Sequence, residues 1–269
     1  MTCCRCQALE RIAGQREPGQ REPVAGGRSG SWLASSRGMT TDSGAGVYPA
    51  TERTTPTRHS DRARYDVQAI HALLDEAITC HVGYIDDGPI VIPTIHVRSG
   101  DHLYLHTSSG SRLARLSAQE GGTPVCVTVT LLDGLVLARS QFNHSMNYRS
   151  VVVRGAGVAV VGEQERKDGL AAVVEHVAAG RSTHSRPPNR RELAATALVK
   201  LPIEEASMKT RNGPPVDDES DLGLPHWAGV VAAKIAYGPA FPAPDLPYDV
   251  PVPQQLANYN RSARPSGYR

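Results

Sequence analysis

Short runs of β-branched residues separated by Gly- and Asp-containing turns constrain this chain more than any other feature. HVGYI at 81–85, IVIPTIHV at 90–97 and HLYLHT at 102–107 follow one another with the turns DDGP and SGD between them, a pattern typical of an antiparallel meander. Because closing a sheet removes its exposed edges, roughly eight strands with few helices predict one closed or half-closed barrel of the mainly β (α+β) class. The further expected strands are 124–132, 148–161, 196–203 and 228–236, with a less regular one at 134–140.

Few segments have helical periodicity. Asp66 is a suitable N-cap, and the apolar residues after it recur at helical spacing, which predicts a helix over 66–79. A short helix is expected at 111–119 and an amphipathic one at 167–178. The polar stretch 181–191 contains two consecutive prolines and is expected to be a loop. The helices are therefore expected to be peripheral to the barrel.

Composition divides the chain into three regions. Residues 1–60 are rich in Gly, Arg, Ser, Thr and Pro and lack periodicity, so we expect a disordered N-terminal extension in which Met39 is a candidate translation start. Residues 61–240 contain all the strand patterns and form the predicted domain. Residues 241–269 are Pro-rich and are expected to be a flexible tail.

The distribution of charge argues against a nucleic-acid partner. The formal net charge is +2, but residues 1–64 alone contribute ten Arg against six acidic residues. Residues 65–237 hold 16 basic and 19 acidic side chains, so the folded part is slightly acidic and offers no footprint for a phosphate backbone. No apolar run approaches the ~20 residues of a membrane-spanning helix, and no segment near the start resembles a secretory signal. We expect a cytoplasmic protein with no membrane partner.

Cysteine and histidine residues do not indicate a metal site. The three cysteines within the first six residues lack a second ligand pair at zinc-finger spacing, and Cys80 and Cys126 fit as small buried side chains in apolar runs. His102 and His106 are four residues apart on one strand, about 13 Å between Cα atoms, which is too far to share an ion. We expect no metal, while one histidine of this strand facing a ligand stays possible.

Two glycine-containing segments invite a phosphate-binding interpretation. Residues 108–112, SSGSR, connect a strand to a short helix, and their hydroxyl, N–H and guanidinium groups can bind an anion. An ordinary capped turn is the alternative, and the segment lacks the Gly-Lys-Ser/Thr ending of a P-loop. In RGAGVAVVG at 154–162 the glycines interrupt a Val-rich strand, so a bent strand is the better interpretation than a dinucleotide-binding turn.

A second group of polar and aromatic residues indicates a ligand only weakly. Tyr148, Arg149 and Ser150 lie at the entrance to an apolar strand, where a ring can stack on a planar ligand and a guanidinium can bind its phosphate. Lys209 in EASMKTRNG and the downstream Trp227 have the same potential. Exposed surface positions explain all five residues equally well.

Taken in order, these segments resemble the pyridoxamine 5′-phosphate oxidase-like FMN-binding split-barrel family, near its bacterial nitroimidazole-resistance reductases. The resemblance covers about residues 60–245 and is carried by HVGYIDDGPIVIPTIHV, HLYLHTSSGSR, NYRSVVVRGAGVAV, EASMKTRNGPP and HWAGVV. It implies a split β-barrel, a homodimer, and FMN bound in two clefts at the dimer interface.

The resemblance also implies which residues hold the cofactor. Residues 92–94 would pass the isoalloxazine edge, 106–108 and Arg112 would hold the ribityl phosphate, and 148–150 would approach from the same or the partner chain. His106 would orient the ligand or donate a proton, which makes it the candidate catalytic residue. The family often has a Gly after the strand-ending His, whereas Thr107 and Ser108 follow His106 here, and Arg112 stands where Lys is also common. The complete implied set is Ile92, Pro93, Thr94, His106, Thr107, Ser108, Arg112, Tyr148, Arg149, Ser150, Lys209 and Trp227.

The function that the resemblance implies is an FMN-dependent oxidoreductase that passes electrons from NAD(P)H to a small planar acceptor. The Pro-rich tail lacks the substrate-phosphate signature of vitamin B6 oxidases, so B6 oxidation is not expected. Three alternatives remain open: a deazaflavin or haem ligand in the same barrel, a non-catalytic flavin-binding or sensing protein, and a structural barrel with a basic arm. The charge distribution disfavours the last of these.

Overall fold

The computed structural model describes residues 46–246 and 250–260. Met39, the cysteine cluster and most of the expected extension lie outside the described residues. Residues 46–60, also assigned to the extension, contact the domain: the Tyr48 N–H donates to the Tyr65 carbonyl at 2.9 Å, and the Tyr48 hydroxyl lies 2.7 Å from His71 Nε2. The folded part of the chain therefore includes residues before 61.

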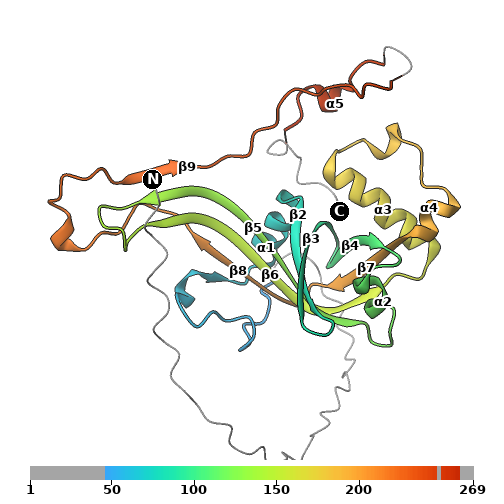
Figure 1. The fold of residues 1–269 in the computed structure, drawn as a ribbon. Helices are drawn as coiled ribbons and strands as arrows, with labels where there is room; N and C mark the ends of the chain where they lie inside the picture. Colours follow the sequence, from blue (N-terminus) through green and yellow to red (C-terminus); the bar gives the residue numbers. More distant parts are fainter. Residues whose placement is uncertain (1–45, 247–249, 261–269) are drawn as a thin grey trace, which may run out of the picture. The chain divides into compact units, whose positions relative to one another are not determined.

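Nine strands form an antiparallel sheet in the described part of the chain (Figure 1). Its order is β1-β8-β6-β7-β4-β3-β2-β5-β9, and an additional pairing of β5 with β6 joins six strands into the ring β5-β2-β3-β4-β7-β6. This arrangement confirms the mainly β prediction. The strands are β1 (Ala63–Arg64), β2 (Thr79–Ile85), β3 (Pro89–Ser99), β4 (His102–Ser108), β5 (Thr123–Leu137), β6 (Ser145–Ala159), β7 (Thr196–Pro202), β8 (Glu205–Arg211) and β9 (Gly229–Ala232).

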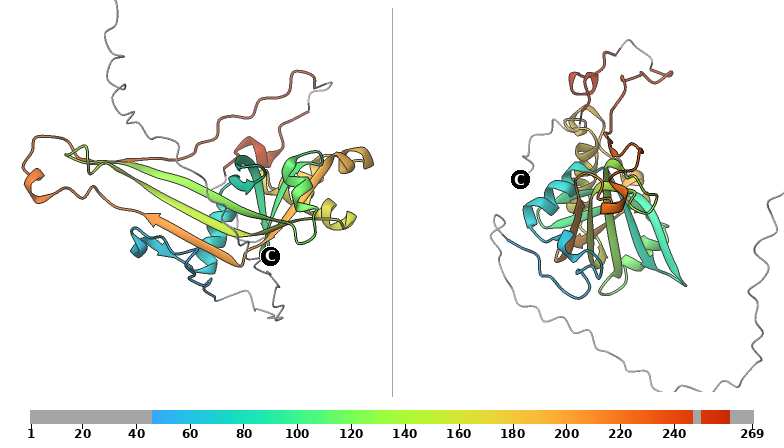
Figure 2. Two further views of the ribbon diagram at one scale, coloured as in Figure 1. Left: turned by 60° about the horizontal axis from the view of Figure 1, so that its bottom comes forward. Right: turned by 90° about the vertical axis from the view of Figure 1, so that its left-hand side faces the viewer.

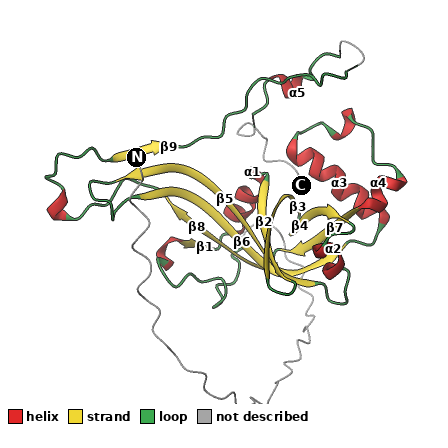
Figure 3. Ribbon diagram, in the orientation of Figure 1, coloured by secondary structure: helices red, strands yellow, loops and turns green. Residues whose placement is uncertain are grey.

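The helices lie at the periphery of the sheet (Figure 3). Asp66 caps α1 as expected, because its Oδ1 accepts the Ala69 N–H at 2.7 Å. Two helices were not predicted. Helix α4 begins inside the polar stretch 181–191, where Asn189 and Glu192 form a reciprocal capping box, and the short helix α5 lies within the expected Pro-rich tail. No helix among the described residues is long and apolar enough to cross a membrane. The helices are α1 (Val67–Glu76), α2 (Arg112–Ser117), α3 (Glu163–Val177), α4 (Arg190–Ala195) and α5 (Gln254–Ala257).

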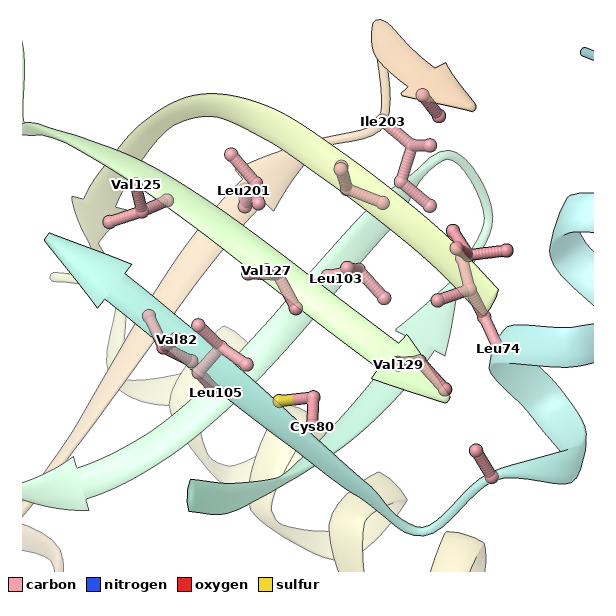
Figure 4. Packing of buried hydrophobic residues seen from close by; sticks show 14 of the residues in the cluster. Leu74, Cys80, Val82, Leu103, Leu105, Val125, Val127, Val129, Leu201 and Ile203 are labelled. Atoms are coloured by element: carbon pink, nitrogen blue, oxygen red, sulfur yellow. The ribbon is translucent and has the colours of Figure 1, made fainter. Parts of the chain in front are cut away.

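Alternate side chains of the ring strands pack inward on one core (Figure 4). Along β5, residues 123–129 alternate strictly between buried and more exposed positions, as a strand with one face on the core must. Val82, Val127 and Val153 share one row of the register and are fully buried. Leu73 and Leu74 of α1 add to the same cluster.

The β5–β6 hairpin is longer than the sequence indicates. The two strands predicted at 124–132 and 134–140 are one strand with a register shift between Leu132 and Gly134, and its distal part pairs with β9. Figures 1 and 2 show this part, residues 131–148, extending past the ring as an arm. The glycines of 154–162 lie within or just after β6, and Cβ atoms at Gly155 and Gly157 would come within 2.8 and 3.0 Å of β7 side chains. Close strand packing therefore explains this Gly-rich segment.

Candidate functional site

The first group of predicted residues lies where β3 approaches the end of β4. Ile92, Pro93 and Thr94 pair with β2 on one edge of β3. On its other edge, β3 pairs with β4 only from His96 to Ser99, so among the described residues no strand covers that edge over 90–94. Thr94 Oγ1 donates to the His106 carbonyl at 3.3 Å. Free backbone groups of β3 thus lie beside the end of β4.

The loop that follows β4 is held by its own hydroxyl groups. Thr107 Oγ1 donates to Ser111 Oγ at 3.0 Å, and Ser111 Oγ accepts the Ala114 N–H at 3.0 Å as the N-cap of α2. Ser108 Oγ accepts the Gly110 N–H at 3.3 Å. These bonds fix the loop, as the capped-turn interpretation requires. They also leave the Arg112 side chain 60% exposed, so that its guanidinium can bind an anion.

His106 faces away from this loop. Its cross-strand partner is Leu198 of β7, and directly opposed residues share one face of a sheet. Leu198 packs against Gly169 of α3, and Tyr104, two residues before His106, donates its hydroxyl to Glu165 of α3 at 3.1 Å. The His106 ring therefore lies on the side covered by α3. Its Nδ1 is buried and has no hydrogen-bond partner among the described residues.

A second group of predicted residues lies on β6 and β8. Ser150 and Lys209 are register partners, and Ser150 Oγ donates to the Lys209 carbonyl at 3.3 Å. Lys209 Nζ donates to the Arg58 carbonyl at 3.0 Å. Tyr148 pairs with Leu132 and Arg211. In the sheet order β7 lies between β6 and β4, and in the other direction round the ring β5 and β2 lie between β6 and β3.

Arg149 belongs to an ion-pair network. Its guanidinium donates to both carboxylate oxygens of Glu76 at 2.5 and 2.9 Å and to both of Asp133 at 3.0 and 2.9 Å. These hydrogen bonds, first those to Glu76 and then those to Asp133, raise the pKa of Arg149 above its usual range. The network joins the end of α1 to the irregular position of β5. Four of the five N–H groups of Arg149 are therefore occupied by carboxylates, which makes it a structural anchor in this chain.

Trp227 lies far from the phosphate loop within one chain. It is 68% exposed and precedes β9, against whose first residue, Gly229, its ring packs. Figures 1 and 2 show β9 along the arm and α2 at the other end of the β5–β6 hairpin. The structure thus brings together residues 92–94, 106–108 and 112, and keeps 148–150 and 209 in a second place and Trp227 in a third.

Sequence reasoning missed a hollow beside the loop. It has a volume of about 320 Å³ and is lined by Asp86 from the β2–β3 turn and by Arg112, Arg115, Leu116 and Gln119. Arg112 Nε lies 3.6 Å from Asp86 Oδ2. The spacing of Arg112 and Arg115, three residues apart at the start of an expected helix, was the signal that could have indicated it.

No other element of the described part of the chain covers the outer face of β2, β3, β5 and β6. Pro93, His81, Thr128 and Val152 follow one another across β3, β2, β5 and β6, and each points away from the core. Large apolar side chains are exposed on these strands and on the arm. They are Ile85 (67%), Val91 (66%), Leu132 (46%), Leu135 (47%) and Met146 (50%).

Comparison with known proteins identifies a family that the chain matches over more than half of its length. Residues 66–210 match the family model described as pyridoxamine 5′-phosphate oxidase. No curated protein matches the chain. The matched span runs from the cap of α1 into β8 and contains every predicted site residue except Trp227.

Several solved structures are similar. The flavocytochrome Anf3 from Azotobacter vinelandii is 39% identical, with a TM-score of 0.71, over 77% of this chain and 95% of that one. An FAD and haem binding protein from Mycobacterium smegmatis is 33% identical, with a TM-score of 0.68, over 73% and 98% of the two chains. A proposed 5-nitroimidazole antibiotic resistance protein from Bacteroides thetaiotaomicron is 23% identical, with a TM-score of 0.46, over 55% and 85%.

Proposed function

The chain belongs to the family that the pyridoxamine 5′-phosphate oxidase model describes, and on this premise we propose that it is a flavin-binding oxidoreductase. The observation that carries the proposal is the meeting of two features. The uncovered edge of β3 over residues 90–94 lies beside the fixed loop 107–112, and the contact of Thr94 with the His106 carbonyl joins them. A flavin has a planar ring and a phosphate on a flexible chain. The ring needs hydrogen-bonding groups along its edge, which the β3 backbone offers, and the phosphate needs an anion site, which the loop offers.

The residues present fit a flavin phosphate. Arg112 offers an exposed guanidinium at the end of a loop whose shape is fixed by Thr107, Ser108 and Ser111 before any ligand arrives. Because the loop is already ordered, little conformational entropy is lost on binding. Backbone groups on the uncovered edge of β3, including the carbonyl of Pro93, which as a proline has no N–H to donate, can hydrogen-bond the polar edge of the ring. Arg149 is not a phosphate ligand in this proposal, since two carboxylates occupy it.

When bound, the flavin supplies hydride and electron transfer, and the protein supplies position and electrostatics. NAD(P)H is the proposed electron donor and a small planar molecule the proposed acceptor, as the family resemblance implies. Thr94 keeps the β3 edge in register with β4, and Arg112 neutralises the phosphate. His106 acts in this proposal through its main chain, because its ring lies on the side covered by α3.

Two similar structures support a flavin and favour haem as a second ligand. One is a flavocytochrome and the other a protein that binds FAD and haem. A flavin together with haem is therefore the second candidate function. FMN, expected from the sequence, is one of the flavins to be tested.

The proposal includes a homodimer. The outer sheet face exposes Val91 at 66% and Leu132 at 46% beside smaller side chains, and the arm continues this apolar surface. A second copy of the chain that covered these apolar side chains would remove them from water, which lowers the free energy of the assembly. In such a dimer Tyr148, Ser150 and Lys209 would complete the cleft from the partner subunit, while Arg149 would stay bound to Glu76 and Asp133. Light scattering of the purified chain should give twice the chain mass of 28.8 kDa; a monomer at micromolar concentration would contradict this part.

Absorption spectroscopy of the purified full chain tests the function. We expect flavin bands that bleach when NAD(P)H is added without oxygen. Arg112→Ala should lower flavin affinity about tenfold, the loss of one charge-assisted contact, whereas Arg191→Ala, an exposed arginine on α4, should change nothing. A chain that neither carries flavin nor binds it on titration would overturn the proposal. A Soret band beside the flavin bands supports the flavocytochrome candidate, and bound flavin that NAD(P)H never bleaches supports the sensing alternative.

A further inference from the structure

One histidine stands on the outer face of the sheet beside the proposed site of the flavin ring. His81 of β2 is the register partner of Pro93 on β3. Its neighbours along β2, Cys80 and Val82, are fully buried in the core (Figure 4), so the His81 imidazole projects from the opposite face, where it is exposed. Directly opposed Cβ atoms lie about 4.5–5.5 Å apart. The imidazole is therefore next to the segment 90–94, on which the proposed function depends.

The strands around His81 present a floor of small side chains. Thr128 is its register partner on β5, and in the next row Gly83 of β2 lies between Val91 and Cys126. A Cβ atom built on Gly83 would meet nothing closer than 3.6 Å, so there is room above the strand at this position. In the proposed homodimer a second copy of the chain would cover this face. The floor would then be one wall of a cleft in which a flat molecule can lie with one edge at the imidazole.

No neighbouring group holds the His81 proton. In the described part of the chain its ring takes part in no hydrogen bond, ion pair or ring contact. By register, the titratable or charged side chains on this side are Cys126 of β5 and Arg154 behind it on β6, while β3 presents uncharged side chains. The carboxylates just before and just after β2, Glu76 and Asp86, each lie beside an arginine. A protonated imidazole can therefore give its proton to a bound molecule.

We propose that His81 is the catalytic residue that protonates the electron acceptor, and that this acceptor is a conjugated carbonyl compound of the quinone type. The inference rests on the proposed function and adds the class of acceptor and its proton donor. Neighbouring strands are about 4.8 Å apart, a gap that one six-membered ring with its two oxygens spans. Such a ring can lie with one oxygen above β3 and the other beside His81 on β2.

The reduction balances with these groups. The hydride that the proposed function supplies forms an O–H bond at the carbonyl above β3, and the displaced π electrons reach the oxygen at the far end of the ring. That oxygen takes the proton from the His81 imidazolium, so both carbonyls become hydroxyls. The electron pair of the broken N–H bond stays on the ring nitrogen, which recovers a proton from water.

Two acceptors compared in the flavin-loaded full chain, with NAD(P)H as donor, test this proposal. Naphthoquinone needs a proton for each hydride, whereas ferricyanide takes electrons singly and needs none. A positioned general acid contributes about 100-fold or more, so His81→Gln should lower kcat with naphthoquinone about 100-fold and change the ferricyanide rate less than twofold. His184→Gln, which replaces an exposed histidine that follows α3, is the matched control and should change neither rate.

The pH dependence separates proton donation from a merely structural role. Histidine changes its charge between about pH 5 and 8. The ratio of the naphthoquinone rate to the ferricyanide rate should therefore fall over this range in the unmodified chain and stay constant in His81→Gln.

Two further measurements locate the acceptor. In NMR of the oxidised, flavin-loaded chain with isotope-labelled histidine, added naphthoquinone should shift one imidazole signal, the one that is missing from His81→Gln. Gly83→Val puts a branched side chain on the floor, at a strand position that suits one, and should raise the KM for naphthoquinone about tenfold without changing the ferricyanide rate. Circular dichroism shows whether each variant is folded, and Gly83→Ala, whose Cβ has room, gives the measurement if Gly83→Val is not.

The possible failures are distinct. An equal loss of both rates in His81→Gln, an unchanged naphthoquinone rate or an unmoved imidazole signal overturns the role of His81 while flavin binding stands. A chain that reduces ferricyanide but not naphthoquinone overturns the acceptor class and the inference with it. A chain that binds no flavin overturns the proposed function itself.

Discussion

Replacing Arg149 separates its structural role from a ligand-binding one. The side chain is 34% exposed and makes two bidentate ion pairs, with Glu76 on α1 and with Asp133 on β5. A well-formed pair at a partly exposed position contributes about 1 kcal/mol, so the two together contribute about 2 kcal/mol. For a domain of this size each kcal/mol corresponds to about 2–4 °C in Tm. We expect Arg149→Ala to lower Tm by about 4–8 °C.

The same variant should leave flavin binding nearly unchanged. Thermal unfolding of the flavin-free chain gives the Tm, and fluorescence titration gives the affinity. Arg112→Ala is the matched control, because it should do the opposite: Arg112 is 60% exposed, with a single long contact to Asp86, so its loss should leave Tm within about 1 °C while weakening flavin binding. Arg149→Lys should recover part of the stability, since it keeps the charge but loses the bidentate geometry. If Arg149→Ala leaves Tm unchanged, or weakens flavin binding as much as Arg112→Ala does, the anchor assignment is wrong.

Three further outcomes are expected. Gly169→Ala should destabilise the chain by about 1–3 kcal/mol in urea unfolding, because its Cβ would overlap the buried Leu198 Cδ2; adding Leu198→Val should recover part of this, and additive losses would contradict the contact. Burial raises the pKa of Cys80 to about 12, so a thiol reagent at pH 8 should label Cys80 only after denaturation, as peptide mass spectrometry can show. Hydrogen bonds from Arg186 and then from the Asn189 backbone lower the pKa of Glu192 from 4.5 to about 2. That stabilisation is present above pH 4.5 and lost as the pH falls towards 2, so amide exchange at the start of α4 should accelerate over this window, and an identical pH response in Glu192→Gln would refute it.

Local features of the sequence were enough for much of the fold. The cap at Asp66, the alternation along β2 to β5 and the short turns of the meander depend on neighbouring residues, and each appears where it was predicted. The strand interpretation of 154–162 also held, since Gly155 and Gly157 lie in β6. Helix α4 was missed because its capping box follows two prolines that indicate a loop on their own.

The candidate site depended more on tertiary structure. The loop 107–112 and residues 92–94 were placed together by the resemblance, and the structure brings them together through Thr94 and His106. The role of Arg149 was not visible, because Glu76 and Asp133 are 73 and 16 residues away from it in the chain. The direction of the His106 ring was not visible either, since it depends on which face of β4 the later helix α3 covers.

The sequence by itself determined the class of fold, the family resemblance and the loop that offers an anion site. Strand alternation, turns and helix caps each depend on a few consecutive residues, so they can be identified from the sequence. Only the tertiary structure decided which arginine is available to a ligand. Arg112 and Arg149 have the same chemistry, but the fold brings two carboxylates to Arg149 and leaves Arg112 at the mouth of a hollow with Arg115. The side chains that contact each arginine cause this difference. They come from distant parts of the chain, so a local sequence pattern does not predict them.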